Sequence, residues 1–279
     1  MVEAPAPGGT LYVVATPIGN LGDITLRALE VLRTVPLAAA EDTRIARRLW
    51  ARYDIATRLV SYHAKSGTRR HAELIEHLGA GNDLALVSDA GTPLVSDPGG
   101  ELVADWLALG GATVPIPGAS AVLAALVVSG FAAPRWAFEG FLPRSGRERR
   151  VRLARIAADE RATVLFESAR RAGATLSDLA EVCGIDRRAA LTRELTKIHE
   201  ETWRGSMSEL AAKAGATPPR GEVTIVVEGA DPNVSSAADA EAVDEARSEV
   251  DRLVSGGISR SSAARQVAQE RNLRRRDLY

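Results

Sequence analysis

Three short segments rich in Gly, Pro, Ser and Asp each follow an apolar run of strand length. They are residues 16–23 (TPIGNLGD), 88–93 (SDAGTP) and 117–121 (PGASA). In an open α/β sheet, ligands bind in the crevice outside the carboxyl ends of the strands. Three such turns in one domain predict a pocket lined largely by backbone, suited to a small polar cofactor.

Apolar runs of four to five residues alternate with segments of helical periodicity through the first half of the chain. A break at residues 130–134 precedes a second alternating series, so we expect an α/β protein with domains at residues 1–130 and 131–230. The expected strands of the first half are residues 11–15, 37–40, 59–62, 84–87 and 113–116. Those of the second half are residues 136–141, 163–166, 189–192, 198–204 and 223–227.

Residues 231–279 form the third expected unit, a linker and a helical tail. Residues 230–240 are small and polar and are predicted to be a linker. Helices are expected over residues 241–253 and, capped by Ser259, through residue 269, with a last turn over residues 273–279. The tail is either helix-turn-helix-like or a small packing module or dimer arm, and the sequence leaves these open.

Composition favours a cytoplasmic protein. Cys183 is the only cysteine, so no disulfide can form within the chain, which is typical of a reducing compartment. The apolar stretch at residues 11–15 is too short for a signal peptide or a membrane span. We therefore expect no membrane partner.

The formal net charge is −1, but arginines gather in three clusters. Solvated helix faces would explain any one of them, whereas three clusters of arginine favour contact with phosphate. The candidate residues for such contact, which the resemblance described below implies would be with RNA, are Arg44, Arg144, Arg147, Arg150, Arg274 and Arg275.

Several common motifs are absent from the sequence. No Gly-x-Gly-x-x-Gly follows the first strand, and there is no Walker A or Gly-x-Ser-x-Gly sequence. The four histidines lack the spacing of metal ligands, so no metal site is predicted.

Acidic residues follow several expected strands. Asp89 comes after the run at 84–87, and a second Asp-Pro-Gly turn follows at Asp97, which favours a ligand-facing turn over a purely structural one. Glu41 and Asp42 either stabilise a helix start or face the pocket. Ser120 either caps a helix or exposes free N–H groups to a ligand. Glu167 repeats the pattern of strand and then acid in the second half.

Taken in order, these motifs resemble the tetrapyrrole methylase superfamily, and within it the family that methylates small-subunit ribosomal RNA. The resemblance runs from about residue 10 to 229 and rests on residues 14–23, 40–44 (AEDTR), 87–93, 96–99 (SDPG), 117–120, 140–143 (GFLP), 193–197 (RELTK) and 221–224 (GEVT). The chain departs from it where relatives often read Glu-Ser-Pro-His-Arg and Tyr-His-x-x-Asn. Here these segments are residues 167–171 (ESARR) and 62–66 (YHAKS).

The resemblance implies two α/β domains with mixed sheets, S-adenosylmethionine bound in the cleft between them, and a homodimer. The implied reaction is 2′-O-methylation of a decoding-centre cytidine of 16S rRNA in the small ribosomal subunit. The implied cofactor residues are Pro17, Ile18, Ser88, Asp89, Ala90, Gly91, Leu94, Val95, Ser120, Ala121, Phe166, Ser168, Leu195 and Thr224.

A ribose hydroxyl is a weak nucleophile, so a general base would assist its methylation. The candidates are Glu167 and Glu41 first, then Asp42, Asp89 and Lys197. Lys197 would need a lowered pKa to act as a base. Two other functions stay open: C-methylation of a tetrapyrrole, which uses the same fold, and a ligand-sensing regulator that binds nucleic acid through the tail.

Overall fold

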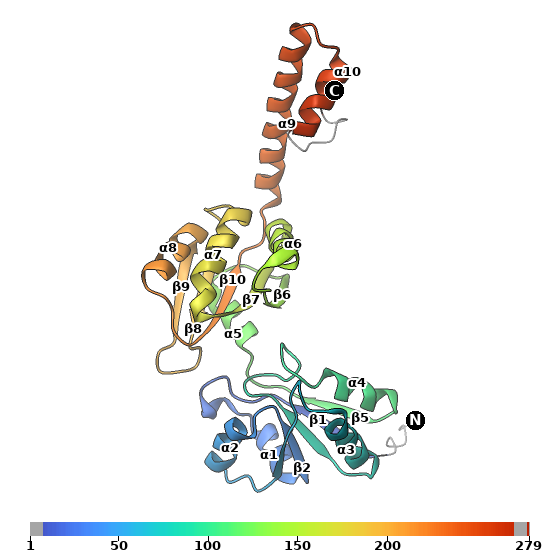
Figure 1. Ribbon diagram of the computed structural model, residues 1–279. Helices are drawn as coiled ribbons and strands as arrows, with labels where there is room; N and C mark the ends of the chain where they lie inside the picture. Colours follow the sequence, from blue (N-terminus) through green and yellow to red (C-terminus); the bar gives the residue numbers. More distant parts are fainter. Residues whose placement is uncertain (1–7, 271–277, 279) are drawn as a thin grey trace.

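The computed structural model describes residues 8–270 and residue 278. It contains two five-stranded sheets, one after the other along the chain, followed by a pair of helices that extends away from the second sheet (Figure 1). Arg274 and Arg275, and most of the turn expected at residues 273–279, lie outside the described residues.

The first sheet is entirely parallel, with strand order β3-β2-β4-β1-β5. Its strands are β1 (Thr10–Val14), β2 (Leu37–Ala40), β3 (Arg58–Ser61), β4 (Leu84–Val87) and β5 (Ala112–Ile116). The helices between them are α1 (Leu26–Thr34), α2 (Thr43–Arg52), α3 (Thr68–Gly79) and α4 (Gly100–Ala108).

Helices cover both faces of this sheet. One core joins α1 and α2 to Val14, Ala38 and Ala85, and the other joins α3 and α4 to Leu11 and Leu84. The central strand β4 is buried at all four residues, as its unbroken apolar sequence predicts. This doubly wound arrangement brings the carboxyl ends of β1, β2 and β4 to one edge, where the motif-bearing turns begin.

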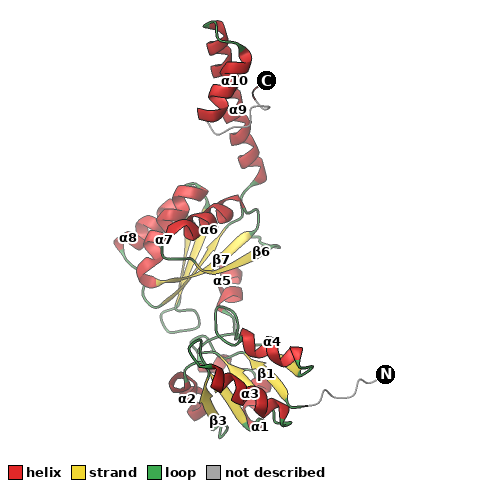
Figure 2. Cartoon of the chain, turned by 45° about the vertical axis from the view of Figure 1, so that its right-hand side comes forward, coloured by secondary structure: helices red, strands yellow, loops and turns green. Residues whose placement is uncertain are grey.

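The second sheet is mixed, with order β6-β7-β10-β8-β9; only β6 and β7 are parallel. Its strands are β6 (Trp136–Phe141), β7 (Ala162–Ser168), β8 (Arg188–Arg193), β9 (Glu201–Ser206) and β10 (Glu222–Val227). Three helices lie together on one side of it, α6 (Gly146–Ala158), α7 (Ala169–Cys183) and α8 (Met207–Ala216) (Figure 2).

Helix α5 (Ala121–Ser129) covers the other face of the second sheet. Its Val122 and Ala125 share a core with Val164, Ala190 and Val226. Our sequence expectation ended the first domain at residue 130, but this packing joins α5 to the second sheet. Because α5 follows directly on the 117–121 turn, it also links that turn to the second domain.

The tail differs from the expectation in one respect. The segment expected to be a linker, residues 230–240, is helical from Pro232, so α9 runs as one helix over Pro232–Ser255. Proline at the first helical position removes no intrahelical hydrogen bond, which explains why it does not prevent this start. Helix α10 (Arg260–Glu270) packs on α9 in a core that includes Val250 and Val267, and Ser259 accepts a hydrogen bond from Ser262 N as its expected cap.

Candidate functional site

A cavity of about 490 Å³ lies where the turns of the first sheet meet α5 and the second sheet. A volume of a few hundred Å³ is typical of a pocket for a cofactor-sized ligand. From the first domain and α5 it is lined by Ile18, Glu41, Asp89, Ala90, Gly91, Thr92, Val95, Ser96, Asp97, Ser120, Ala121 and Val122. From the second sheet and its loops it is lined by Phe141, Phe166, Glu167, Ser168, Ala169, Thr192, Leu195, Gly221, Glu222, Val223 and Thr224.

Backbone hydrogen bonds hold the first two turns together. Thr16 N donates to Gly91 O at 2.8 Å, and Gly91 N donates back to Thr16 O at 3.0 Å. Gly91 has φ +81°, a conformation that side chains rarely adopt, and a Cβ there would lie 3.3 Å from Ile18. The SDAGTP turn therefore needs glycine at this position to keep its place beside Ile18.

Two loops, one from each domain, present an apolar side chain to the cavity in the same way. Val95 lies between Leu94 and Ser96, and Leu195 lies between Glu194 and Thr196; all four flanking residues have positive φ. Left-handed backbone at non-glycine residues is uncommon and clusters at ligand sites. The matched loops thus favour a binding role for the cavity.

Ser120 combines both of the roles that the sequence left open. It is the N-cap of α5, its Oγ accepting from Leu123 N at 3.4 Å, and it also lines the cavity. The chain reaches this cap through Gly118, where a Cβ would lie 2.9 Å from that of Ala15.

Three carboxylates share the first-domain side of the cavity, Glu41, Asp89 and Asp97. Burial raises the pKa of each, and the negative charge of Asp89 raises the pKa of both Glu41 and Asp97 further. Hydrogen bonds only partly offset these effects. The cavity therefore concentrates negative charge that would be stabilised by a cationic ligand.

The Glu41-Asp42 pair divides between the two roles considered from the sequence. Asp42 caps α2, with Oδ1 accepting from Arg44 N at 2.8 Å, while Glu41 lines the cavity. The side-chain hydrogen bond from Arg44 lowers the pKa of Asp42 to about 2. Asp42 is therefore a weak base that does not line the cavity, and its proposed catalytic role is not supported.

Lys197 does not have the lowered pKa that a lysine would need to act as a general base. Its Nζ lies 3.0 Å from Glu194 Oε1 and 3.0 Å from Glu222 Oε2, and it does not line the cavity. Burial alone would lower the pKa of Lys197, but the hydrogen bonds to these two carboxylates outweigh it and raise the pKa. The lowered pKa that a lysine base would need is therefore not found at this position.

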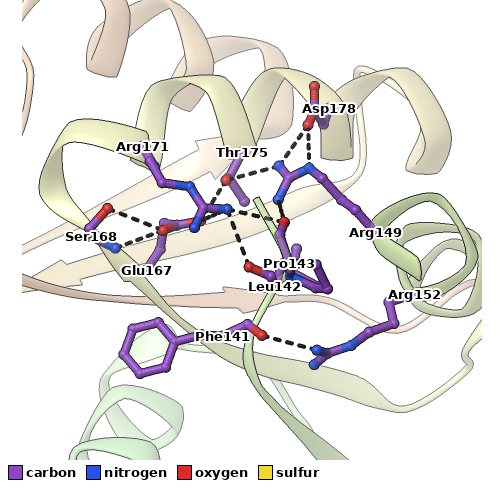
Figure 3. Close-up of polar contacts among 10 residues, drawn as sticks. All are labelled: Phe141, Leu142, Pro143, Arg149, Arg152, Glu167, Ser168, Arg171, Thr175 and Asp178. Carbon is purple, nitrogen blue, oxygen red and sulfur yellow. Dashed lines mark hydrogen bonds and ion pairs between the residues drawn. The ribbon is translucent and has the colours of Figure 1, made fainter. Parts of the chain in front are cut away.

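Glu167 lines the cavity but directs its carboxylate into a hydrogen-bond network at the start of α7 (Figure 3). Oε1 accepts from Ser168 N at 2.8 Å, and Oε2 accepts from Thr175 Oγ1 at 2.7 Å. Arg171 adds an ion pair at 3.4 Å, and the Glu167 side chain is 1% exposed. These partners occupy both carboxylate oxygens of Glu167. Glu41 and Asp89, two other candidates, line the cavity with a raised carboxyl pKa, and so does Asp97, which the sequence had not singled out as a base.

The cavity brings together most of the cofactor residues expected from the sequence, namely Ile18, Asp89, Ala90, Gly91, Val95, Ser120, Ala121, Phe166, Ser168, Leu195 and Thr224. The remaining expected residues, Pro17, Ser88 and Leu94, lie next to lining residues but do not line it. Sequence reasoning gave no binding role to Asp97, Thr192 and Phe141, although Asp97 lies in an Asp-Pro-Gly turn and Phe141 in the 140–143 segment that carries the resemblance.

The arginine cluster around α6 separates into two groups. Arg149 and Arg152 point inward. Arg149 pairs with Asp178, and Arg152 donates to Phe141 O (Figure 3). Arg152 also pairs with Glu139. The candidate RNA-binding residues Arg144, Arg147 and Arg150 are exposed, and no ion pair is found for them among the described residues. Arg44, also a candidate, is exposed but pairs with Asp42.

The described residues contain neither a cluster of metal-ligating side chains nor a membrane-spanning helix. No group of three or more His, Cys, Asp or Glu side chains there is arranged to hold a metal ion. Within the same part of the chain, no helix has the length and hydropathy needed to cross a membrane.

Comparison with known proteins gives consistent matches. The family model of the Tetrapyrrole (Corrin/Porphyrin) Methylases matches residues 10–211. A protein named ribosomal RNA small subunit methyltransferase I from Synechocystis sp. is 46% identical over 271 residues, covering 97% of this chain and 96% of its own length. A protein of the same name from Bacillus subtilis is 41% identical, covering 97% of this chain and 93% of its own length.

Among solved structures, uroporphyrin-III C-methyltransferase from Thermus thermophilus, in complex with S-adenosylhomocysteine, superposes with a TM-score of 0.60. It is 20% identical, and the match covers 79% of this chain and 97% of that one. This likeness confirms the α/β methylase fold expected from the sequence. Of the expected mixed sheets only the second is mixed; the first is entirely parallel, because a helix crosses over between each pair of its successive strands.

Proposed function

This chain belongs to the tetrapyrrole (corrin/porphyrin) methylase family, and from that membership and its site we infer that it is an S-adenosylmethionine-dependent methyltransferase of small-subunit ribosomal RNA. The observation that carries the inference is the cavity between the two domains, which is lined by residues of the motif-bearing turns at 16–23, 88–93 and 117–121. The reaction we assign is 2′-O-methylation of a cytidine in the decoding centre of 16S rRNA.

The residues of the cavity fit the donor. Ile18, Val95 and Leu195 provide apolar walls for an adenine ring. The negative carboxylates of Glu41 and Asp89 stabilise the positive charge of a sulfonium. When bound, S-adenosylmethionine supplies an electrophilic methyl group. The protein's own part is to hold that methyl in line with the acceptor oxygen, since alignment alone can supply much of the acceleration.

The acceptor in this proposal is RNA held through its backbone by the exposed arginines. Arg144, Arg147 and Arg150 have guanidinium groups free to contact phosphate, and such contacts weaken steeply as salt increases. The cytoplasm, where small ribosomal subunits are found, is the compartment that this substrate implies.

A homodimer forms part of the proposal. Helix α5 is apolar on its outer side as well as on the side that packs on the second sheet: Leu123 is 51% and Val127 81% exposed. A helix that is hydrophobic all round is usually buried, so a second copy of the chain would explain this face. Light scattering tests the point, with twice the monomer mass as the expected result.

The tail is proposed as a further RNA contact. Among the described side chains, the core of α9 and α10 is separate from those of the two sheets. Deleting residues 239–279 should therefore leave cofactor binding unchanged and reduce methylation of assembled subunits. Unchanged methylation would show that the tail has another role.

The test of the function is transfer of a labelled methyl group from S-adenosylmethionine to small ribosomal subunits from a strain that lacks this modification. We expect label in the ribose of a 16S rRNA cytidine. Label in a tetrapyrrole, or binding of a DNA operator with no transfer, would support the two functions that the sequence left open and contradict this one.

A further inference from the structure

A second cavity, of about 540 Å³, lies beside the first one within the first domain. It is bounded by the loop that follows β3, by the start of α3 and by the start of α4. Its lining residues are Tyr62, His63, Ala64, Ser66, Thr68, His71, Asp97, Pro98, Gly99, Gly100, Glu101 and Asp105.

Asp97 is the one residue that lines both cavities. Glu41 and Asp89 line the first cavity alone. A group that reacts with the methyl donor must enter at the junction between the donor and the acceptor. Among the cavity carboxylates, that position belongs to Asp97.

Hydrogen-bonding side chains make up most of the second cavity's wall, and some of them are fixed in place. Tyr62 OH lies 2.9 Å from His71 Nδ1, and His71 Nε2 lies 2.9 Å from Asp105 Oδ2. Ser66 Oγ accepts from His63 N at 2.8 Å and so fixes the turn that carries Ala64. A wall held in this way is prepared for a polar ligand rather than an apolar one.

The charge of the wall selects among polar ligands. Asp97, Glu101 and Asp105 bring three carboxylates to the cavity, which disfavours a ligand that carries several carboxylates of its own. A nucleoside has an uncharged sugar and base with several hydrogen-bond donors. Carboxylates accept hydrogen bonds from such donors, including the exocyclic amine of cytosine.

We propose that the second cavity holds the acceptor nucleoside of the RNA and that Asp97 accepts the proton of its reacting 2′-hydroxyl. The hydroxyl oxygen forms the new bond to the methyl carbon while the carbon–sulfur bond breaks and its electron pair stays on sulfur. The hydroxyl proton passes to the Asp97 carboxylate and later to water. This assignment rests on the proposed function, because it needs an RNA acceptor.

Both the position of Asp97 between the two cavities and its acidity suit the role of a general base. Burial, together with the charge of Asp89, raises the pKa of Asp97 from its ordinary value. A carboxylate with a raised pKa is a stronger base, and general base catalysis is worth about 100-fold or more. Asp97 is therefore a catalytic residue in this scheme, whereas Tyr62 and His71 are positioning residues that shape the wall.

The experiment compares two variants with a matched control. Asp97→Asn removes the base, and Ala64→Trp fills the second cavity from an exposed turn. Asp54→Asn is the control, because Asp54 is exposed, lines neither cavity, and has a positive φ that asparagine also tolerates. Three quantities are measured for each: the Kd of S-adenosylhomocysteine, the Kd of small subunits without donor, and kcat for methylation.

Asp97→Asn is expected to lower kcat about 100-fold or more, with less than about a threefold change in either Kd. Ala64→Trp is expected to weaken subunit binding about tenfold or more and to leave the Kd of S-adenosylhomocysteine unchanged. Unchanged kcat in Asp97→Asn, or unchanged subunit binding in Ala64→Trp, would overturn the assignment. Failure of the wild-type protein to methylate RNA would instead contradict the proposed function.

Discussion

The carboxylate of Asp89 accepts a hydrogen bond from the backbone amide of Asp42, with 2.9 Å between Oδ1 and N. The two residues follow the neighbouring strands β4 and β2, so this contact joins two turns at the same edge of the sheet. It fixes Asp89 through the backbone and leaves its negative charge at the cavity. The charge of Asp89 can therefore be changed with little change in its position.

Asp89→Asn should weaken the binding of S-adenosylmethionine about five- to tenfold, which corresponds to about 1–1.4 kcal/mol. Asparagine keeps an oxygen that can accept from Asp42 N, so the substitution removes mainly charge. S-adenosylhomocysteine lacks the sulfonium charge and should lose less affinity. Calorimetric titration of both proteins with both ligands measures these losses of affinity. Equal losses for the two ligands would show that the charge of Asp89 does not stabilise the sulfonium.

Acidification should weaken binding of the cationic donor. The pKa values of Glu41, Asp89 and Asp97 are raised by burial, so in the folded protein these groups take up protons at a higher pH than their ordinary pKa values of 4.5, 3.8 and 3.8. As pH falls through the raised values, the cavity loses negative charge. Because a raised carboxyl pKa favours the protonated folded state, the same groups stabilise the unliganded protein as pH falls through this window.

The measurement for this prediction is the Kd of S-adenosylmethionine from pH 7.5 to pH 5, with S-adenosylhomocysteine as the uncharged comparison. A decline in affinity that is steeper for the charged ligand is expected. Parallel curves for the two ligands would contradict a role for the three carboxylates in recognising charge.

Glu167→Gln should reduce stability more than catalysis. The substitution places an amide where Ser168 N, Thr175 Oγ1 and Arg171 all need an acceptor, and the loss should be about 2–4 kcal/mol. Thr175→Val removes one of these partners and also the acceptor that Thr175 Oγ1 offers to Arg149, and should cost about 1–2 kcal/mol. Urea unfolding gives the free energies. A stable Glu167→Gln protein with abolished turnover would restore Glu167 as the base.

Two adjacent arginines should behave in opposite ways. Arg149 is 9% exposed and binds Asp178, Thr175 and Pro143 O, so Arg149→Gln should lower the free energy of unfolding by about 2–4 kcal/mol. Arg150 is exposed, so Arg150→Gln should change it by less than about 0.5 kcal/mol.

The effect on RNA binding should be larger for Arg150→Gln than for Arg149→Gln. Arg150→Gln should weaken the affinity for small subunits and reduce the slope of log K against log salt by about one. Arg58→Gln is the control, because Arg58 is an exposed arginine at the start of β3, an edge strand of the sheet in the other domain. An Arg150→Gln protein with an unchanged salt dependence would exclude contact between Arg150 and phosphate.

Local pattern was enough to predict most of the fold. The runs at Leu37–Ala40 and Leu84–Val87 are strands with the expected bounds, because an unbroken apolar run between turn residues has few alternatives. The prediction of a linker at residues 230–240 was wrong. Small residues such as alanine are compatible with a helix, and Pro232 occupies the first helical position, where proline is tolerated.

Pairing between distant residues could not be predicted in the same way. The sequence placed Glu167 after a strand, but its partners Thr175 and Arg171 depend on how α7 folds back over β7. Likewise, the sequence does not distinguish Arg149 from Arg150. In the structure, the ion pair with Asp178 places Arg149 on the covered side of α6. The motif-bearing turns were predictable as a pocket because each follows a strand whose end lies at a common edge.

Calorimetric titration of the protein with S-adenosylmethionine and its demethylated product measures whether the inter-domain cavity binds the methyl donor. We expect one site per chain for both ligands, with micromolar affinity, and loss of binding of both ligands when Ala121, which lines this cavity, is replaced by tryptophan. Absence of binding by either ligand to the wild-type protein, or full binding by Ala121→Trp, would contradict this expectation.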